Sequence, residues 1–222
     1  MSIVADIAFF SASPLKIVDG GWFPLTIACI VFTVMITWRS GRQILMRRLQ
    51  SSAIPLETFR KSLLEYPPSR VPGTAIFMAP ESGAVPHALL HNLSHNKVLH
   101  ERVIFVTVII SDIPYVPAGD RVRVEQMGDE WYTIRMNFGF KDRPDVSAGL
   151  RLCAGHGLEF NLLETSFFLN RETLVPVSGN EDGMALWRER MFAAMARNAS
   201  SITDYFNIPT NRVIELGTRI EI

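Results

Sequence analysis

The segment from Gly20 to Trp38 contains no charged side chain over nineteen residues. As an α-helix rising about 1.5 Å per residue, it would be about 28 Å long, close to the ~30 Å hydrocarbon core of a bilayer. Trp22 and Trp38 stand at its two ends, where indole rings prefer the level of the lipid headgroups. A buried helix of a soluble domain could have the same length, but the bracketing tryptophans favour a transmembrane helix over residues 20–38.

Charge after this segment predicts its orientation. Arginines follow the span directly, and no acidic residue occurs before Glu57. The positive-inside rule therefore places the chain after Trp38 in the cytoplasm. We predict four residues as membrane-interface anchors in contact with membrane lipid: Trp22, Trp38, Arg39 and Arg42.

Composition narrows the function classes. Lys+Arg and Asp+Glu both number 22, a balance that argues against a nucleic-acid partner. Hydrophobic residues make up 48% of the chain, enough apolar surface to exclude intrinsic disorder. Cys29 and Cys153 are far apart, which excludes a disulfide framework and a four-cysteine zinc site.

Four regions follow from these patterns. Residues 1–19 lack the basic start of a signal peptide and are predicted to be an uncleaved membrane-proximal segment. The transmembrane helix occupies 20–38. Residues 39–68 form a basic juxtamembrane segment with a short amphipathic helix that ends at Pro67-Pro68. Residues 69–222 are predicted to be a cytoplasmic α/β domain.

Local patterns in residues 69–222 predict a mixed sheet. A strand over 74–79, a helix over 86–96 and a strand over 103–110 have the length of a βαβ unit. Residues 121–127 and 131–138 predict a hairpin. Further elements are expected at 145–157 (helix), 167–175 (strand), 184–206 (one long helix) and 213–222 (half-buried strand). In the long helix, apolar residues such as Met184, Trp187 and Met191 approximate a 3.6-residue repeat, and Asp182 is a plausible N-cap.

The histidines and the loop at 178–183 are the candidate ligand sites. His87, His91 and His95 are four residues apart and share a helical stripe, so His91 and His95 could hold a zinc ion. A structural role is favoured, because Asn92 stands where a zinc protease needs a glutamate. The loop before the long helix could hold a phosphate, although its two acidic residues oppose that. No P-loop, GxGxxG or GxSxG motif is present, so an enzyme is not predicted and the cofactor-binding residues are unknown.

Several longer motifs resemble the bacterial KUP (HAK/KUP/KT) potassium uptake family, over essentially the whole chain and in order. They are GGWFPL at 20–25, TW-R-x-GR at 37–42, RVPGTAIFM at 70–78, HALLHNLSHNKVLHERVIFVTV at 87–108, FFLNRET at 167–173, MALWRERMFAAMARNASSITDYF at 184–206 and NRVIELGTRIEI at 211–222.

The resemblance implies a proton-coupled potassium transporter of the inner membrane, with potassium ion and proton as the transported species. It covers only the final membrane helix, its approach segment and the cytoplasmic domain. The family's ion-binding groups lie on earlier helices, so none is carried over to this chain. The resemblance also implies a homodimer formed through the cytoplasmic domain and regulation by an intracellular signal.

The leading hypothesis is therefore the carboxy-terminal portion of a KUP-type potassium:proton symporter, which serves regulation or assembly and does not transport alone. The chain would be a fragment of a longer protein, a half that joins missing transporter helices encoded separately, or a decayed copy. The alternative is a stand-alone membrane-anchored domain that senses a nucleotide or a metal.

Overall fold

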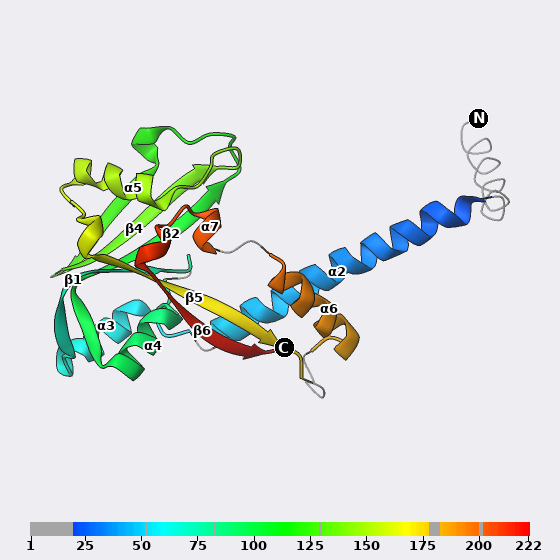
Figure 1. Ribbon diagram of the computed structural model, residues 1–222, viewed down its shortest axis with the longest axis horizontal. Helices are drawn as coiled ribbons and strands as arrows, with labels where there is room; N and C mark the ends of the chain where they lie inside the picture. The colour runs from blue at the N-terminus through cyan, green and yellow to red at the C-terminus, as the bar shows by residue number, and fades with distance from the viewer. Residues whose placement is uncertain (1–19, 52, 82, 129, 178–182, 200–201) are drawn as a thin grey trace. The chain divides into compact units, whose positions relative to one another are not determined.

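The computed structural model describes residues 20–51, 53–81, 83–128, 130–177, 183–199 and 202–222, and the other residues lie outside this account. These residues divide into two compact units, whose helices and strands are labelled in Figure 1. The helical unit comprises Met1–Arg47, Pro176–Arg197 and Glu221–Ile222. The sheet unit comprises Arg48–Val175 and Asn198–Ile220.

One long helix, α2 (Trp22–Ser51), dominates the helical unit. It confirms the predicted helix over 20–38 and extends it by more than three turns. The arginine-rich segment after Trp38 contains no proline, and apart from Gly41 and two serines it consists of residues that tolerate or favour a helix. Among the described residues, this is the one helix long and apolar enough to cross a membrane. A second helix, α6 (Leu186–Arg197), belongs to the same unit.

The sheet unit is built on six strands in the order β3-β4-β2-β1-β5-β6. The predicted βαβ unit is confirmed: β1 (Ser69–Met78) and β2 (Val98–Ser111) are parallel neighbours, and α4 (His87–Asn96) connects them. Four residues at the middle of β2, from Val103 to Val106, are almost completely buried. This burial on both faces of the sheet explains their uniformly apolar sequence.

The remaining strands extend this parallel pair on both sides. The predicted hairpin is confirmed as β3 (Val122–Gly128) and β4 (Trp131–Gly139), with β4 parallel to β2. On the other side, β5 (Thr165–Val175) pairs in parallel with β1, and β6 (Val213–Glu221) lies next to β5 at the edge of the sheet.

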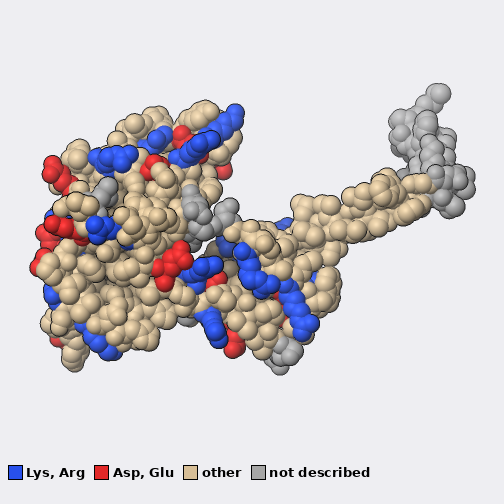
Figure 2. Space-filling view, in the orientation of Figure 1, with Lys and Arg blue, Asp and Glu red and all other residues tan. Residues whose placement is uncertain are grey.

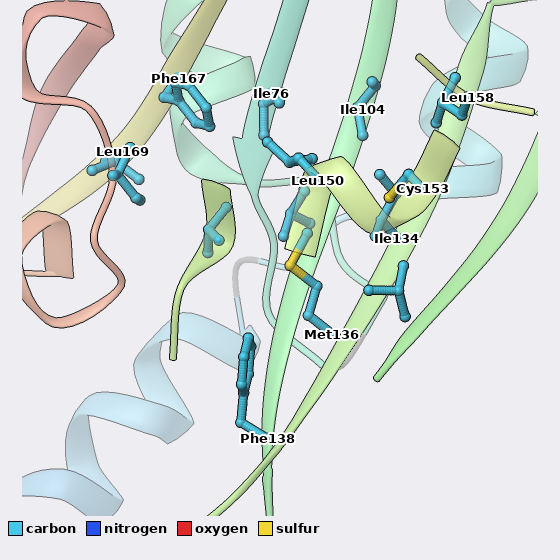
Figure 3. Packing of buried hydrophobic residues seen from close by; sticks show 14 residues of the cluster. Ile76, Ile104, Ile134, Met136, Phe138, Leu150, Cys153, Leu158, Phe167 and Leu169 are labelled. Carbon is cyan, nitrogen blue, oxygen red and sulfur yellow. The ribbon is translucent and has the colours of Figure 1, made fainter. Parts of the chain in front are cut away.

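Helices cover both faces of the sheet. On one face, α3 (Leu56–Glu65) and α4 pack on a cluster that includes Phe77, Phe105 and Phe168. On the other face lies α5 (Val146–Leu152), whose Leu150 packs with Ile76, Ile104 and Ile134, as Figure 3 shows. Successive β1 residues therefore serve opposite clusters, as the alternation of a strand requires.

An aspartate ties together the loops that follow β2 and β4. Oδ2 of Asp142 accepts hydrogen bonds from the backbone N–H groups of Val116 (3.0 Å) and Gly139 (2.8 Å). Its Oδ1 accepts a hydrogen bond from Arg121 at 3.2 Å. The two backbone N–H groups, assisted by the Arg121 charge, hold the pKa of the Asp142 carboxyl below its usual value.

The single helix predicted over 184–206 is wrong. The structure has α6 and a separate short helix, α7 (Ile202–Tyr205). The two helices belong to different units, since Phe192 is buried in the helical unit whereas Thr203 and Ile208 are buried in the sheet unit. Asn198 begins a segment rich in weak helix formers, at the point where the chain leaves the helical unit.

Candidate functional site: the apolar helix and the helix that packs on it

The exposure of α2 changes abruptly along its length. From Trp22 to Ile36, its residues are exposed except Thr33, which is half-buried. Thr37 is then completely buried, and burial recurs at Gly41 and at Ile44 and Leu45. This i, i+4, i+7, i+8 spacing forms one stripe on a helix. The apolar part of α2 therefore presents an uncovered surface, while its polar end carries a packed stripe.

Arg188 of α6 binds this stripe at its first turn. Its Nε donates to Oγ1 of Thr37 at 3.1 Å, and its Nη2 donates to the backbone oxygen of Ile36 at 3.3 Å and to Oγ of Ser40 at 3.4 Å. The planar guanidinium thus makes three hydrogen bonds within one turn of α2, which a lysine could not reproduce in the same directions. Because Thr37 is buried, its hydroxyl depends on this partner.

Phe192 supplies the apolar part of the same contact. Its ring is fully buried and meets the indole of Trp38 edge to face, with centroids 5.5 Å apart. It also lies directly against Gly41, where the absence of a side chain leaves room for the ring. Complete burial of a phenylalanine side chain stabilises a contact by about 1.5–3 kcal/mol. The aromatic contact therefore stabilises the packing of α6 on α2, and the hydrogen bonds of Arg188 set which turn of α2 the helix contacts.

One of the three buried residues of α6 is acidic. Glu189 is 1% exposed, and its Oε1 accepts a hydrogen bond from the backbone N–H of Met184 at 3.1 Å. Its Oε2 is buried and has no hydrogen-bond partner among the described residues. The buried side of α6 thus consists of Glu189, Phe192 and Ala193, whereas the apolar repeat pointed to a face containing Trp187, which is 57% exposed. The predicted N-cap Asp182 lies outside the described residues.

The predicted interface anchors lie at both ends of the uncovered part of α2. Trp22 is exposed and meets Phe23 edge to face. Trp38 is partly exposed, and its ring also contacts Phe192. Sixteen residues separate the two indoles, about 24 Å along a helix. Arg39 and Arg42 are both exposed, one and four residues beyond Trp38. Their assignment as anchors stays a prediction.

One histidine of the stripe on α4, His91, contacts the sheet. His91 and His95 stack with ring centroids 5.8 Å apart. Oγ1 of Thr218 donates to Oδ1 of Asn170 at 2.8 Å and lies 3.3 Å from Nε2 of His91. Since the threonine proton is directed to Asn170, Nε2 of His91 is the donor in the second contact. That nitrogen is therefore occupied by a structural hydrogen bond.

The described residues contain no group of three or more histidine, cysteine, aspartate or glutamate side chains placed to hold a metal ion. His100 is on β2, where burial lowers its pKa, and its ring meets the edge of Phe168. The pairing of His91 and His95 follows their spacing, but the structure assigns them no third ligand among these residues. The possible phosphate loop at 178–183 lies almost wholly outside the described residues.

Sequence reasoning missed Arg188, Glu189 and Phe192 as contact residues. Arg188 and Thr37 are 151 residues apart, and neither stands in a motif with its own chemistry. One local signal was present: Arg188 and Phe192 are four residues apart and so lie on neighbouring positions of one helix.

Comparison with known proteins matches two parts of the chain, and the first part ends within α2. Residues 1–43 match the family described as the K+ potassium transporter integral membrane domain, and residues 72–222 match the K+ potassium transporter C-terminal domain. A relative in Herminiimonas arsenicoxydans, the "Probable potassium transport system protein Kup", is 55% identical over 222 residues. Relatives in Janthinobacterium sp. (strain Marseille) and Cupriavidus necator are also 55% identical.

Each of these three matches covers 99% of this chain and 35% of the relative. The chain therefore spans about a third of the length of the curated relatives it matches. No solved structure matches the chain.

Proposed function

Because the chain belongs to the K+ potassium transporter family, in which it matches the C-terminal domain and the end of the integral membrane domain, we propose that it is the carboxy-terminal portion of a potassium:proton symporter. In this proposal the whole transporter takes up potassium across the bacterial inner membrane. α2 is its last membrane-spanning helix, and the sheet unit is cytoplasmic. The chain itself serves regulation or assembly.

One observation carries this proposal: Arg188 joins the two matched regions. The arginine lies in the segment matched as the C-terminal domain, and its three acceptors lie in the segment matched as the integral membrane domain. With Phe192 packed on Trp38, the contact fixes α6 to the end of α2. A movement of either helix would therefore be passed to the other, which is what a regulatory or assembly domain requires.

We further propose that the chain does not transport potassium by itself. The apolar part of α2 has no acidic, basic or histidine side chain, whereas ion pathways through membranes usually contain one. Its hydroxyl groups at Thr26 and Thr33 donate to carbonyl oxygens of the same helix, those of Trp22 and Cys29. An ion path would need further helices, such as those in the two thirds of the relatives that this chain does not cover.

The test is potassium-limited growth of a bacterium that lacks its own potassium uptake systems. The chain is expressed alone and, separately, joined to the preceding two thirds of the Herminiimonas relative. We expect growth and rubidium uptake from the joined protein and neither from the chain alone. Failure of a correctly inserted joined protein, or uptake by the chain alone, would contradict the proposal.

The regulatory role is tested in the joined protein with Arg188→Gln. We expect this variant to reach the membrane in normal amount but to take up rubidium more slowly. Arg123→Gln is the control, because Arg123 is an exposed arginine on β3 that makes no contact with α2 or α6 among the described residues. Equal uptake by both variants would remove the basis for coupling through α6.

Dimerisation through the cytoplasmic domain is a separate proposal supported by the family resemblance. Light scattering of the detergent-solubilised chain tests it, with a mass of two chains expected after correction for bound detergent.

A further inference from the structure

The exposed face of α6 combines a large aromatic side chain with arginines. Trp187 is 57% exposed, and Arg190 and Arg197 are exposed as well. On a helix, Trp187 and Arg190 lie nearly opposite Phe192, which is buried against α2. A large indole and two guanidinium groups are thus presented away from the protein. We call Trp187, Arg190 and Arg197 the outer face of α6.

The contact with α2 fixes the position of this outer face relative to the end of the apolar segment. Arg188 binds Ile36, Thr37 and Ser40, the turn of α2 that contains Trp38 at the end of the apolar segment. The first turn of α6 is therefore held level with that end. If the apolar part of α2 crosses the bilayer, Trp187 lies within about one helical turn of the headgroup level.

The charged side chains of α2 and α6 are mostly positive. Within their bounds α2 and α6 contain seven arginines and one carboxylate, Glu189, which is buried. Figure 2 shows Lys and Arg side chains gathered over α6 and the adjoining end of α2, while the preceding rod of α2 lacks charge. Such a basic collar beside an apolar span complements a leaflet of anionic lipid.

We propose that the outer face of α6 is a binding site for anionic phospholipid headgroups of the leaflet at the carboxy-terminal end of α2. Trp187 lies in the interface with its ring among the upper acyl chains, and Arg190 pairs with a lipid phosphate through its planar fork. Arg197, two turns further along the helix, adds long-range attraction. The site depends on α2 crossing the bilayer and not on potassium transport.

Tryptophan emission tests this site in the full chain reconstituted into vesicles. The reporter protein carries Trp22→Phe, which leaves Trp187, Trp38 with its contact to Phe192, and the buried Trp131 of the sheet unit. The control protein carries Trp187→Phe in addition, so that the difference between the two emissions belongs to Trp187. Vesicles contain phosphatidylcholine and phosphatidylglycerol, with a nitroxide group on either lipid at equal mole fraction.

We expect shallow nitroxides to quench the Trp187 emission more than nitroxides deep in the acyl chains. We also expect labelled phosphatidylglycerol to quench it more than labelled phosphatidylcholine. Arg190→Gln should lower this preference by up to about five-fold, the attraction of one arginine to an anionic surface. Arg123→Gln, which removes an exposed arginine of β3, should leave it unchanged.

Three results would overturn the proposal. Quenching of Trp187 by aqueous iodide but not by lipid nitroxides would place the outer face in water. Protection from both quenchers would mean that protein covers it. Equal quenching by the two labelled lipids would remove the anionic specificity. Flotation of the protein with the vesicles is measured in parallel, so that failed insertion of α2 is recognised separately.

Discussion

Gly41 of α2 lies against the ring of Phe192 of α6, so closely that a Cβ atom at position 41 would overlap three carbons of the ring. Neither partner can withdraw easily, since Phe192 is fully buried and also meets Trp38. The smallest residue of the α2 stripe and the largest buried residue of α6 are therefore complementary.

Replacing Gly41 by alanine is expected to loosen α6 from α2. Overpacking of this kind costs about 1–3 kcal/mol. The measurement is amide hydrogen exchange of residues 186–197 in reconstituted protein, which should become faster. Gly217→Ala in β6 is the matched control, because a Cβ at position 217 meets open space. Unchanged exchange in the Gly41 variant would show that the ring can move aside.

Thr37→Val should weaken the same contact without changing the shape of the side chain. The variant removes the acceptor of the Nε group of Arg188 and leaves a donor unpaired, at a cost of about 1–3 kcal/mol. Exchange of the α6 amides reports the loss. Thr33→Val is the control, since the Thr33 hydroxyl donates only to the Cys29 carbonyl within α2. A double variant with Arg188→Gln should add little, because both changes remove one interaction.

Acid should unfold the sheet unit partly through Asp142. Its pKa is lowered in the folded state by the N–H groups of Val116 and Gly139, so the unfolded chain takes up this proton more readily. The stability that the carboxylate contributes is present above the unfolded pKa of about 4 and is lost as the pH falls through the folded value. Asp142→Asn should lower the melting temperature at neutral pH and flatten its dependence on pH below about 4.

Circular dichroism of the full chain follows that transition, with Asp112→Asn as an exposed control. If both variants melt alike across the pH range, the clamp at Asp142 does not contribute.

Orientation in the membrane is the fourth prediction. With arginines directly after the span, the carboxy terminus should be cytoplasmic. Green fluorescent protein fused after Ile222 should fluoresce, and alkaline phosphatase fused there should be inactive. The reverse pair of results would place the sheet unit outside the cytoplasm and contradict the positive-inside assignment.

Elements with a strong local pattern were predictable from the sequence. The charge-free run of α2, the β-branched centre of β2 and the glycine that ends β3 each specify their structure within about ten to twenty residues. The break between α6 and α7 has no comparable signal. It arises because the chain returns to the helical unit for α6 and leaves it again, a consequence of tertiary packing that propensity does not encode.

The candidate site was predictable only in part. The spacing of His91 and His95 indicates that their rings lie together on α4, but Thr218, the hydrogen-bond partner of His91, comes from a strand 127 residues away. Trp38 was recognised from its position at the end of the span. Its contact with Phe192 depends on a pairing of distant helices that one sequence does not reveal.

The separation of α2 and α6 in the chain also has a consequence for the order of synthesis. The ribosome makes α2 first, and the residues that cover Thr37 and Gly41 emerge only after β1 to β5 have been translated. During that interval of roughly ten seconds or more, the newly inserted helix carries a bare stripe. The stripe is covered only once α6 has been made, so its burial follows the synthesis of β1 to β5.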